Sequence, residues 1–313
     1  MKNPKRILLT GAGGMLGMRL VPRLAAAFRK ATMYAVFHAP PDSANQVFDC
    51  SAIGNLTENK FLDAVLEQAK PDTIVNLAAL TDVELCEREP VLAQSANTEL
   101  VRYLLEATPS AKFVQLSTDY VFDGVKGNYH PRDAVSEQSN HSVYGKTKLN
   151  AEKLVLSDGN QNNNVVIRTS GIYDWLNAKN LFSFFLRSLS EGKKTFALSD
   201  CHYSPIWADD LAQGLIGLLK AGATGMQHYG GAERMHRLQF AKTIADVFQL
   251  DASLIVPRIL ADFNWRAIRP ADSSLDSEAS YALAKVAPKS LALALAEIQL
   301  QLSSKDKALT ATE

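Results

Sequence analysis

The chain has 313 residues, of which 47% are hydrophobic and 21% charged, a composition typical of a globular protein with a large core. Lys plus Arg and Asp plus Glu both number 33, so the formal net charge is zero and electrostatic binding to nucleic acid or to a membrane surface is not expected. Three scattered cysteines, Cys50, Cys86 and Cys201, predict reduced thiols and no metal site. With no apolar leader and no apolar run of membrane-spanning length, the sequence predicts a cytoplasmic protein.

The first predicted elements are a short apolar strand at 6–10 and a helix at 14–29, joined by a glycine-rich turn. Gly11 can adopt the turn dihedrals, Gly14 lets a pyrophosphate approach the backbone, and Gly17 allows the helix to pack closely on the strand. The free N–H groups of the helix N-terminus would bind the phosphates. A glycine repeat alone also fits an ordinary loop, but its position between a strand and a helix indicates dinucleotide binding. The cofactor contacts expected here are Gly11, Gly14, Met15, Leu16 and Gly17.

The second predicted strand, 33–38, bears on which cofactor is bound. No carboxylate ends it, so no group there would hold a ribose 2′-hydroxyl and repel a 2′-phosphate. We therefore expect NADPH, with NADH as the alternative. His38 and Arg19 could each serve the phosphate or be ordinary surface side chains, and the next loop, with Asp49 and Cys50, is expected on the adenine side.

Strand patterns alternate with helical patterns over the first half of the chain, which predicts an α/β fold with a Rossmann-type, doubly wound parallel sheet. The expected strands are 6–10, 33–38, 73–77, 112–117 and 165–168, and the expected helices are 14–29, 58–69, 91–107 and 142–157. Ligands of such sheets bind beyond the carboxyl ends of the strands.

The regularity loosens after Arg168, and a smaller C-terminal α/β lobe is expected to bind the substrate. We assign 1–168 plus about 195–222 to the NAD(P)-binding Rossmann domain. The substrate-binding lobe would comprise about 169–194 plus 223–303, and 304–313 would form a frayed polar tail.

The candidate catalytic residues are Thr118 at the end of the fourth strand, with Ser117 as second choice, and Tyr144 and Lys148 on a later helix. Residues four apart stack on one helix face, and an adjacent ammonium favours the phenolate and lowers the pKa of the phenol. Tyr144 could then exchange a proton with a carbonyl or alcohol, while Thr118 donates to the developing negative charge. Either feature alone also fits a surface Tyr–Lys pair or a strand cap. Their order after the glycine turn indicates a reductase.

These motifs resemble those of an extended short-chain dehydrogenase/reductase, and within that group the dTDP-4-dehydrorhamnose reductase family. The similarity runs through most of the chain, at 10–17, 70–79, 87–90, 117–122, 144–149, 168–170 and 269–276.

This resemblance implies NAD(P)H-dependent reduction of a keto sugar, a nucleotide-linked 4-keto-6-deoxy sugar being the expected substrate, in a homodimer. The further cofactor contacts that it implies are Ala78, Ala79, Thr81, Ser117, Tyr144, Lys148, Thr169 and Ser170. The substrate contacts that it implies are Thr118, Asp119, Tyr120, Tyr144 and Arg269.

Two departures from the family pattern concern the sugar side. The family's Thr-Ser-Trp is Thr169-Ser170-Gly171 here, which removes an aromatic platform for the sugar. Trp175 could replace that platform or could be a core residue. The family's Asp-Gln-Tyr-Gly-x-Pro appears at 200–205, where His202 is expected to be structural rather than catalytic.

Two other functions remain open. The regulatory β subunit of methionine adenosyltransferase is similar at 119–124 and 240–250, which would imply NADP binding and a protein partner without catalysis. A sugar-nucleotide epimerase or dehydratase is the third candidate. Dehydratases usually carry an acidic residue where this chain has Tyr120.

Overall fold

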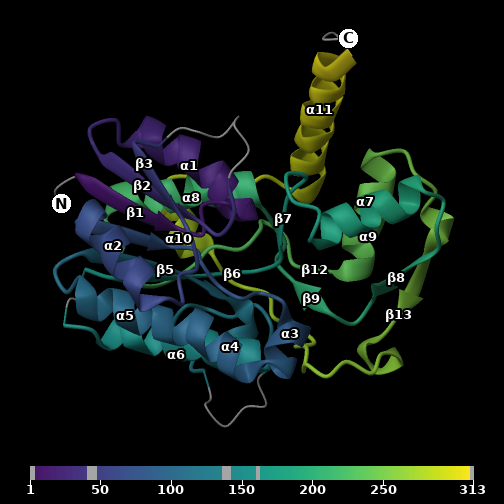
Figure 1. The fold of residues 1–313 in the computed structure, drawn as a ribbon. Coiled ribbons are helices and arrows are strands. Elements are labelled where there is room, and N and C mark those ends of the chain that lie inside the picture. Colours follow the sequence, from purple (N-terminus) through teal and green to yellow (C-terminus); the bar gives the residue numbers. More distant parts are fainter. Residues whose placement is uncertain (1–3, 41–47, 136–141, 160–162, 311–313) are drawn as a thin grey trace.

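The computed structural model describes residues 4–40, 48–135, 142–159 and 163–310. Seven parallel strands form the central sheet, in the order β11-β6-β5-β4-β1-β2-β3 (Figure 1). Their bounds are β1 Arg6–Thr10, β2 Thr32–Phe37, β3 Cys50–Ile53, β4 Thr73–Asn76, β5 Lys112–Thr118, β6 Val165–Thr169 and β11 Gly225–His228. This confirms the predicted fold class.

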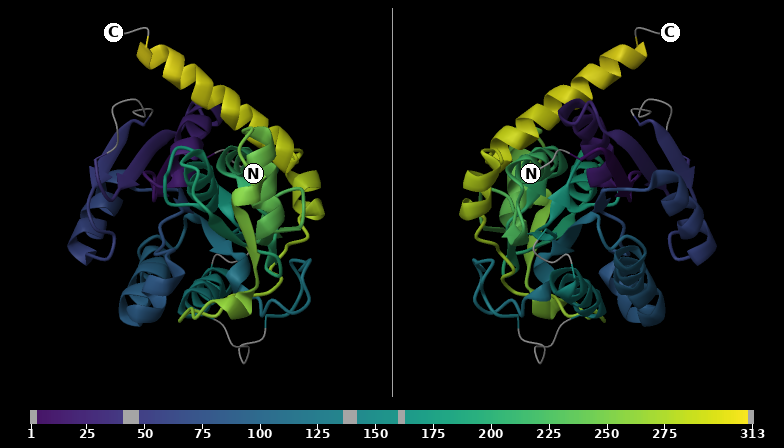
Figure 2. Two further views of the ribbon diagram at one scale, coloured as in Figure 1. Left: turned by 90° about the vertical axis from the view of Figure 1, so that its right-hand side faces the viewer. Right: turned by 90° about the vertical axis from the view of Figure 1, so that its left-hand side faces the viewer.

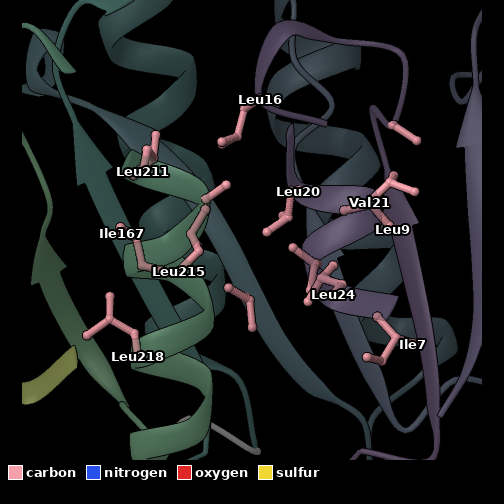
Figure 3. Packing of buried hydrophobic residues seen from close by; sticks show 14 of the residues in the cluster. Ile7, Leu9, Leu16, Leu20, Val21, Leu24, Ile167, Leu211, Leu215 and Leu218 are labelled. Atoms are coloured by element: carbon pink, nitrogen blue, oxygen red, sulfur yellow. The ribbon is translucent and has the colours of Figure 1, made fainter. Parts of the chain in front are cut away.

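One face of the sheet is covered by α1 (Met15–Ala27) and α8 (Ala208–Ala221), with α10 (Glu278–Ala284) beside α8. Ile7 and Leu9 of β1 point to this face. Figure 3 shows leucines of the two helices in one cluster above the sheet, among them Leu16, Leu20, Leu24, Leu211, Leu215 and Leu218. Their spacing of three or four residues places them on a single side of each helix.

The opposite face is covered by α2 (Asn59–Ala69), α5 (Leu100–Ala107) and α6 (Val143–Ser157). Leu8, between the two residues that face α1, points to this side. Ahead of α5 lie α3 (Val83–Arg88), α4 (Pro90–Gln94) and a π-helical turn (Ser95–Glu99), so the expected helix 91–107 is divided.

The smaller lobe lies beside the carboxyl ends of the sheet strands and has its own apolar core (Figure 1). Its strands are β7 Ile172–Tyr173, β8 Thr195–Leu198, β9 His202–Tyr203, β10 Ile206–Trp207, β12 Met235–His236 and β13 Ile255–Arg258. They form the pairs β7 with β10, β8 with β13, and β9 with β12. Its helices are α7 Leu181–Ser190, α9 Arg237–Val247 and α11 Leu291–Thr310.

Several boundaries differ from those expected. We placed 195–198 in the Rossmann domain, but β8 pairs with β13 in the smaller lobe, whereas β11, which we placed in the lobe, pairs with β6 in the central sheet. The helix α11 continues to Thr310, where we expected a frayed tail, and it extends away from the body of the molecule (Figure 2).

Candidate active site

A cavity of about 520 Å³ lies at the carboxyl ends of β1, β4, β5 and β6, between the sheet and the smaller lobe. The cavity therefore lies where ligands of this fold are expected to bind. The expected site residues that line it are Gly11, Gly14, Met15, Leu16, Gly17, Ala78, Ala79, Thr81, Ser117, Thr118, Asp119, Tyr120, Tyr144, Lys148 and Thr169.

The glycine turn at one end of the cavity fits a dinucleotide. Gly11 has φ +68°, and a Cβ there would lie 2.8 Å from the backbone nitrogen of Ala78. A Cβ at Gly17 would lie 2.4 Å from the carbonyl oxygen of Ala12, so both positions require glycine. At Gly14 the nearest atom would be the Gly11 carbonyl oxygen, at 3.2 Å. Gly14 caps α1 without a side chain, which leaves the first N–H groups of the helix facing the cavity for a pyrophosphate.

The helix α6 brings Tyr144 and Lys148 to the other part of the cavity. Ser142 caps this helix and accepts a hydrogen bond from the backbone N–H of Gly145. The Tyr144 phenol hydrogen-bonds the hydroxyl of Thr118 at the end of β5. The Lys148 ammonium donates to the carbonyl oxygen of Leu116, 2.7 Å away. The three predicted catalytic residues therefore lie together in one cavity.

Tyr144 and Lys148 of α6 both have shifted pKa values. Burial raises the pKa of Tyr144, and its hydrogen bond with Thr118 offsets this only in part. We expected Lys148 to give Tyr144 a lowered pKa, and this is wrong for the net shift, because burial outweighs any such effect and the pKa is raised. Burial lowers the pKa of Lys148 to about 8, partly opposed by the negative charge of Glu152. Tyr144 is thus a protonated phenol at neutral pH, the state that a proton donor for carbonyl reduction requires.

Asp119 lines the cavity, but its carboxylate already has three hydroxyl donors. Ser170 donates at 2.7 Å, Ser273 at 2.6 Å and Thr118 at 3.1 Å. Burial raises the pKa of Asp119, while these hydrogen bonds oppose the rise. Asp119 therefore orients Thr118 and joins it to the smaller lobe. Ser170, expected at the cofactor, does not line the cavity because its hydroxyl faces Asp119.

Ser117 and Thr118 point to opposite faces of the sheet, since successive side chains of a strand alternate. The Ser117 hydroxyl donates to Glu152, which also forms a buried ion pair with Arg168 at 2.7 Å. Ser117 therefore contributes backbone rather than its hydroxyl to the cavity, which favours Thr118 as the donor to a substrate.

Two expected adenine-side residues are in the wrong place. Cys50 pairs with Tyr34 in the first half of β2, and the Asp49 carboxylate accepts a hydrogen bond from the backbone N–H of Met33. Both residues therefore lie near the amino ends of the strands, at the end of the sheet opposite the cavity. His38 is exposed beyond the end of β2 and does not line the cavity.

Two arginines that we considered as ligand contacts, Arg19 and Arg269, have other partners. Arg19 forms a two-point ion pair with Asp174, at 2.8 and 3.0 Å, and so connects α1 to the smaller lobe. Arg269, expected at the substrate, forms an ion pair with Glu84 at 3.1 Å, and its guanidinium lies over the ring of Trp265. Arg269 does not line the cavity.

The sequence did not predict several residues that the smaller lobe contributes to the cavity. Tyr173, Tyr203 and Phe240 supply aromatic walls, and the segment before α7 adds Asn177 and Lys179. Gly171, noted as the loss of a platform, itself lines the cavity next to Tyr203. A signal for Tyr203 was present, because it occupies the glycine position of the family's Asp-Gln-Tyr-Gly-x-Pro pattern.

Trp175 and His202 have structural roles. Trp175 packs against the apolar core of the smaller lobe and donates from its indole N–H to Gln301. His202 lies in β9 with its ring against His236, outside the cavity. Within the described ranges no helix is long and apolar enough to cross a membrane.

Comparison with known proteins identifies relatives over nearly the whole chain. Residues 5–303 match the family described as RmlD substrate binding domain. A dTDP-4-dehydrorhamnose reductase of Aggregatibacter actinomycetemcomitans is 30% identical over 285 residues, 87% of this chain and 90% of that protein. The methionine adenosyltransferase 2 subunit beta of Xenopus laevis is 27% identical over 263 residues, 81% of this chain and 75% of that protein. The solved dTDP-4-dehydrorhamnose reductase of Bacillus anthracis str. Ames, in complex with NADP, superposes with a TM-score of 0.79 at 24% identity, covering 96% of this chain and 100% of that one.

Proposed function

The chain belongs to the RmlD family of NAD(P)-dependent oxidoreductases, and we propose that it reduces the ketone of a nucleotide-linked 4-keto-6-deoxy sugar to an alcohol. The observation that carries this proposal is the placement of Thr118, Tyr144 and Lys148 in one cavity whose far end is the glycine turn. A dinucleotide held at the turn would extend toward the three side chains, which is the arrangement that hydride transfer needs.

In the proposed reaction the reduced nicotinamide, when bound, supplies a hydride to the carbonyl carbon. Tyr144 donates its phenolic proton to the carbonyl oxygen. The Thr118 hydroxyl, which donates its one proton to Asp119 in the structure, would turn toward that oxygen and polarise it. The Lys148 ammonium, fixed at one point by the Leu116 carbonyl, has two more protons for a ribose hydroxyl and the phenol. As Tyr144 loses its proton, the positive charge of Lys148 stabilises the phenolate that forms.

We assign the cofactor contacts to the glycine turn with Met15 and Leu16, to Ala78, Ala79 and Thr81, and to the backbone near Ser117 and Thr169. NADPH is favoured over NADH because β2 is followed directly by His38 and two uncharged residues, with no carboxylate to hold a 2′-hydroxyl. The complex of the Bacillus anthracis relative with NADP supports the same preference.

The preference can be measured by titrating the protein with NADPH and NADH and following cofactor fluorescence. We expect a lower dissociation constant for NADPH. Clearly tighter binding of NADH would contradict the assignment, although it would leave the reductase function intact.

Oxidation of NADPH in the presence of a panel of nucleotide-linked keto sugars tests the function itself. Turnover on a dTDP-linked 4-keto-6-deoxy sugar, lost in Tyr144→Phe, is the expected result. Absence of turnover across the panel would contradict the proposal.

A regulatory function is the second candidate, favoured by the similarity to the methionine adenosyltransferase subunit. Stable capture of a methionine adenosyltransferase catalytic subunit, with no keto sugar turned over, would support that function instead. A homodimer remains a prediction, to be tested by light scattering.

A further inference from the structure

Tyr203 occupies the space above Gly171 at the substrate end of the cavity. Gly171 has φ +50°, and a Cβ there would lie 2.4 Å from two ring carbons of Tyr203, so any side chain would displace the ring. Tyr203 is 5% exposed, and its ring packs against that of Phe240, with centroids 6.1 Å apart. The close contact with Gly171 fixes the ring where its hydroxyl can meet a ligand in the cavity.

Two buried donors near this position have no hydrogen-bond partner in the described part of the chain. They are the hydroxyl of Tyr203 and the Nε of Arg237, the first residue of α9. Tyr203 lines the cavity, whereas Arg237 does not line it but interacts with Tyr120 and Tyr203, which both do. Buried polar groups of proteins are nearly always hydrogen-bonded, so these two groups indicate an acceptor supplied by a ligand. Arg269 also has an unpartnered Nε, but its guanidinium already has a counter-charge in Glu84.

The charge at this position favours an anionic acceptor. The Arg237 guanidinium interacts with Tyr120, Cys201 and Tyr203 and hydrogen-bonds the Tyr120 hydroxyl. No ion pair of Arg237 with a carboxylate occurs among the described side chains. A largely enclosed guanidinium without a counter-charge is complementary to a carboxylate or phosphate oxygen.

The position relative to the catalytic residues is also informative. The ring of Tyr120 lies 5.9 Å from that of Tyr144 between centroids, so Arg237 is one side chain removed from the proposed proton donor. The glycine turn, where the cofactor phosphates are assigned, is at the opposite end of the cavity. An anion at Arg237 would therefore belong to the substrate.

We propose that Tyr203 and Arg237 bind a phosphate oxygen of the nucleoside diphosphate part of the substrate. This inference rests on the proposed function, because it places the substrate between these two residues and Tyr144. Burial keeps Tyr203 protonated, so that its hydroxyl remains a donor. The resemblance had placed Arg269 at the substrate, whereas its guanidinium forms an ion pair with Glu84.

Calorimetric titration of the NADPH-bound protein with dTDP tests the pair. Arg237→Gln should weaken dTDP binding by about 10- to 100-fold, the value of a lost charge-assisted hydrogen bond, and Tyr203→Phe by about 10-fold or less. Arg237→Lys should restore part of the affinity because it keeps the charge. Affinity for NADPH should be unchanged in all three variants.

Arg234→Gln is the matched control, since Arg234 is a half-exposed arginine of the same lobe that pairs with Asp272. It should bind dTDP as the wild type does. Equal dTDP affinity in Arg237→Gln and the wild type would overturn the inference and leave the reductase function untouched. A wild type that binds no dTDP at millimolar concentration would also overturn the inference, and the keto-sugar panel would then decide the proposed function separately. Binding of dTDP that depends on Arg237, without turnover of any keto sugar, would support the inference and contradict the proposed function.

Discussion

Glycine makes a close contact possible at both ends of the cavity, but the contact is with backbone atoms at one end and with a side chain at the other. At the proposed cofactor end, Gly11 and Gly17 bring backbone against backbone, and we assign the phosphates to the N–H groups of the turn. At the substrate end, Gly171 makes room for the side chain of Tyr203, which arrives from another strand. A backbone site depends on local dihedral angles, whereas a side-chain site depends on how distant segments pack. We therefore expect substitutions at the two ends to affect different binding constants.

The largest effect is expected between the two ends, at Tyr144. Tyr144→Phe removes the proton donor and should lower kcat by a factor of about 10²–10⁴, the usual loss when a general acid is removed. The dissociation constant of NADPH should change little, because the ring remains in place. Stopped-flow and steady-state kinetics would measure both quantities, and unchanged turnover would refute the catalytic assignment.

The cofactor end can be broken at Gly14. Gly14→Val puts a side chain where the pyrophosphate approaches, and we expect NADPH affinity to fall by about 100-fold or more, the cost of losing several charge-assisted hydrogen bonds. Gly13→Val is the matched control, because a Cβ at Gly13 meets only the ring of Phe37 at 3.4 Å. Similar NADPH affinity in the two variants, measured by fluorescence titration, would argue against binding at the turn.

The pH dependence tests the state of Lys148, whose pKa is lowered to about 8. The ammonium is lost as the pH rises through that value, so kcat/KM should be level below pH 8 and fall roughly tenfold per pH unit above it. Tyr144, with its raised pKa, stays protonated over this range and does not cause the fall. Lys146→Met, at an exposed position of the same helix, should keep the profile. A profile that is flat to pH 10 would contradict the assignment.

The substrate end can be broken at Gly171. Gly171→Ala should displace the Tyr203 ring and raise KM for the keto sugar by about tenfold, which is roughly the effect of losing one hydrogen bond. The affinity for NADPH should not change. The positive φ adds a strain of about 1–2 kcal/mol, which would lower the free energy of unfolding measured in urea. Loss of NADPH affinity together with the rise in KM would show that the two ends are not independent.

The features that the sequence predicted are local ones. The glycine turn and the pair Tyr144–Lys148 each lie within one strand–turn–helix or one helix, where spacing determines geometry. The central strands were also predicted, because their apolar runs are buried on both faces.

The features that the sequence missed depend on packing. β3 and β11 are the two edge strands of the sheet, and their side chains alternate or remain half-exposed, so neither has a continuous apolar run. Without β3, Asp49 and Cys50 could not be assigned to the amino ends of the strands. Tyr203 reaches Gly171 only through the fold of the smaller lobe, so the spacing of residues along the chain does not predict that contact.

The central claim is that Tyr144 and Lys148 serve transfer of a hydride to a sugar ketone. Its most direct test is mass spectrometry of the product formed from a dTDP-linked 4-keto-6-deoxy sugar with NADPH dideuterated at C4 of the nicotinamide. The account predicts a product with one deuterium on the former carbonyl carbon of the sugar. The wild type should form this product rapidly, and Tyr144→Phe should form it more slowly by a factor of about 10²–10⁴. A sugar recovered without deuterium, or labelled equally fast by the variant, would contradict it.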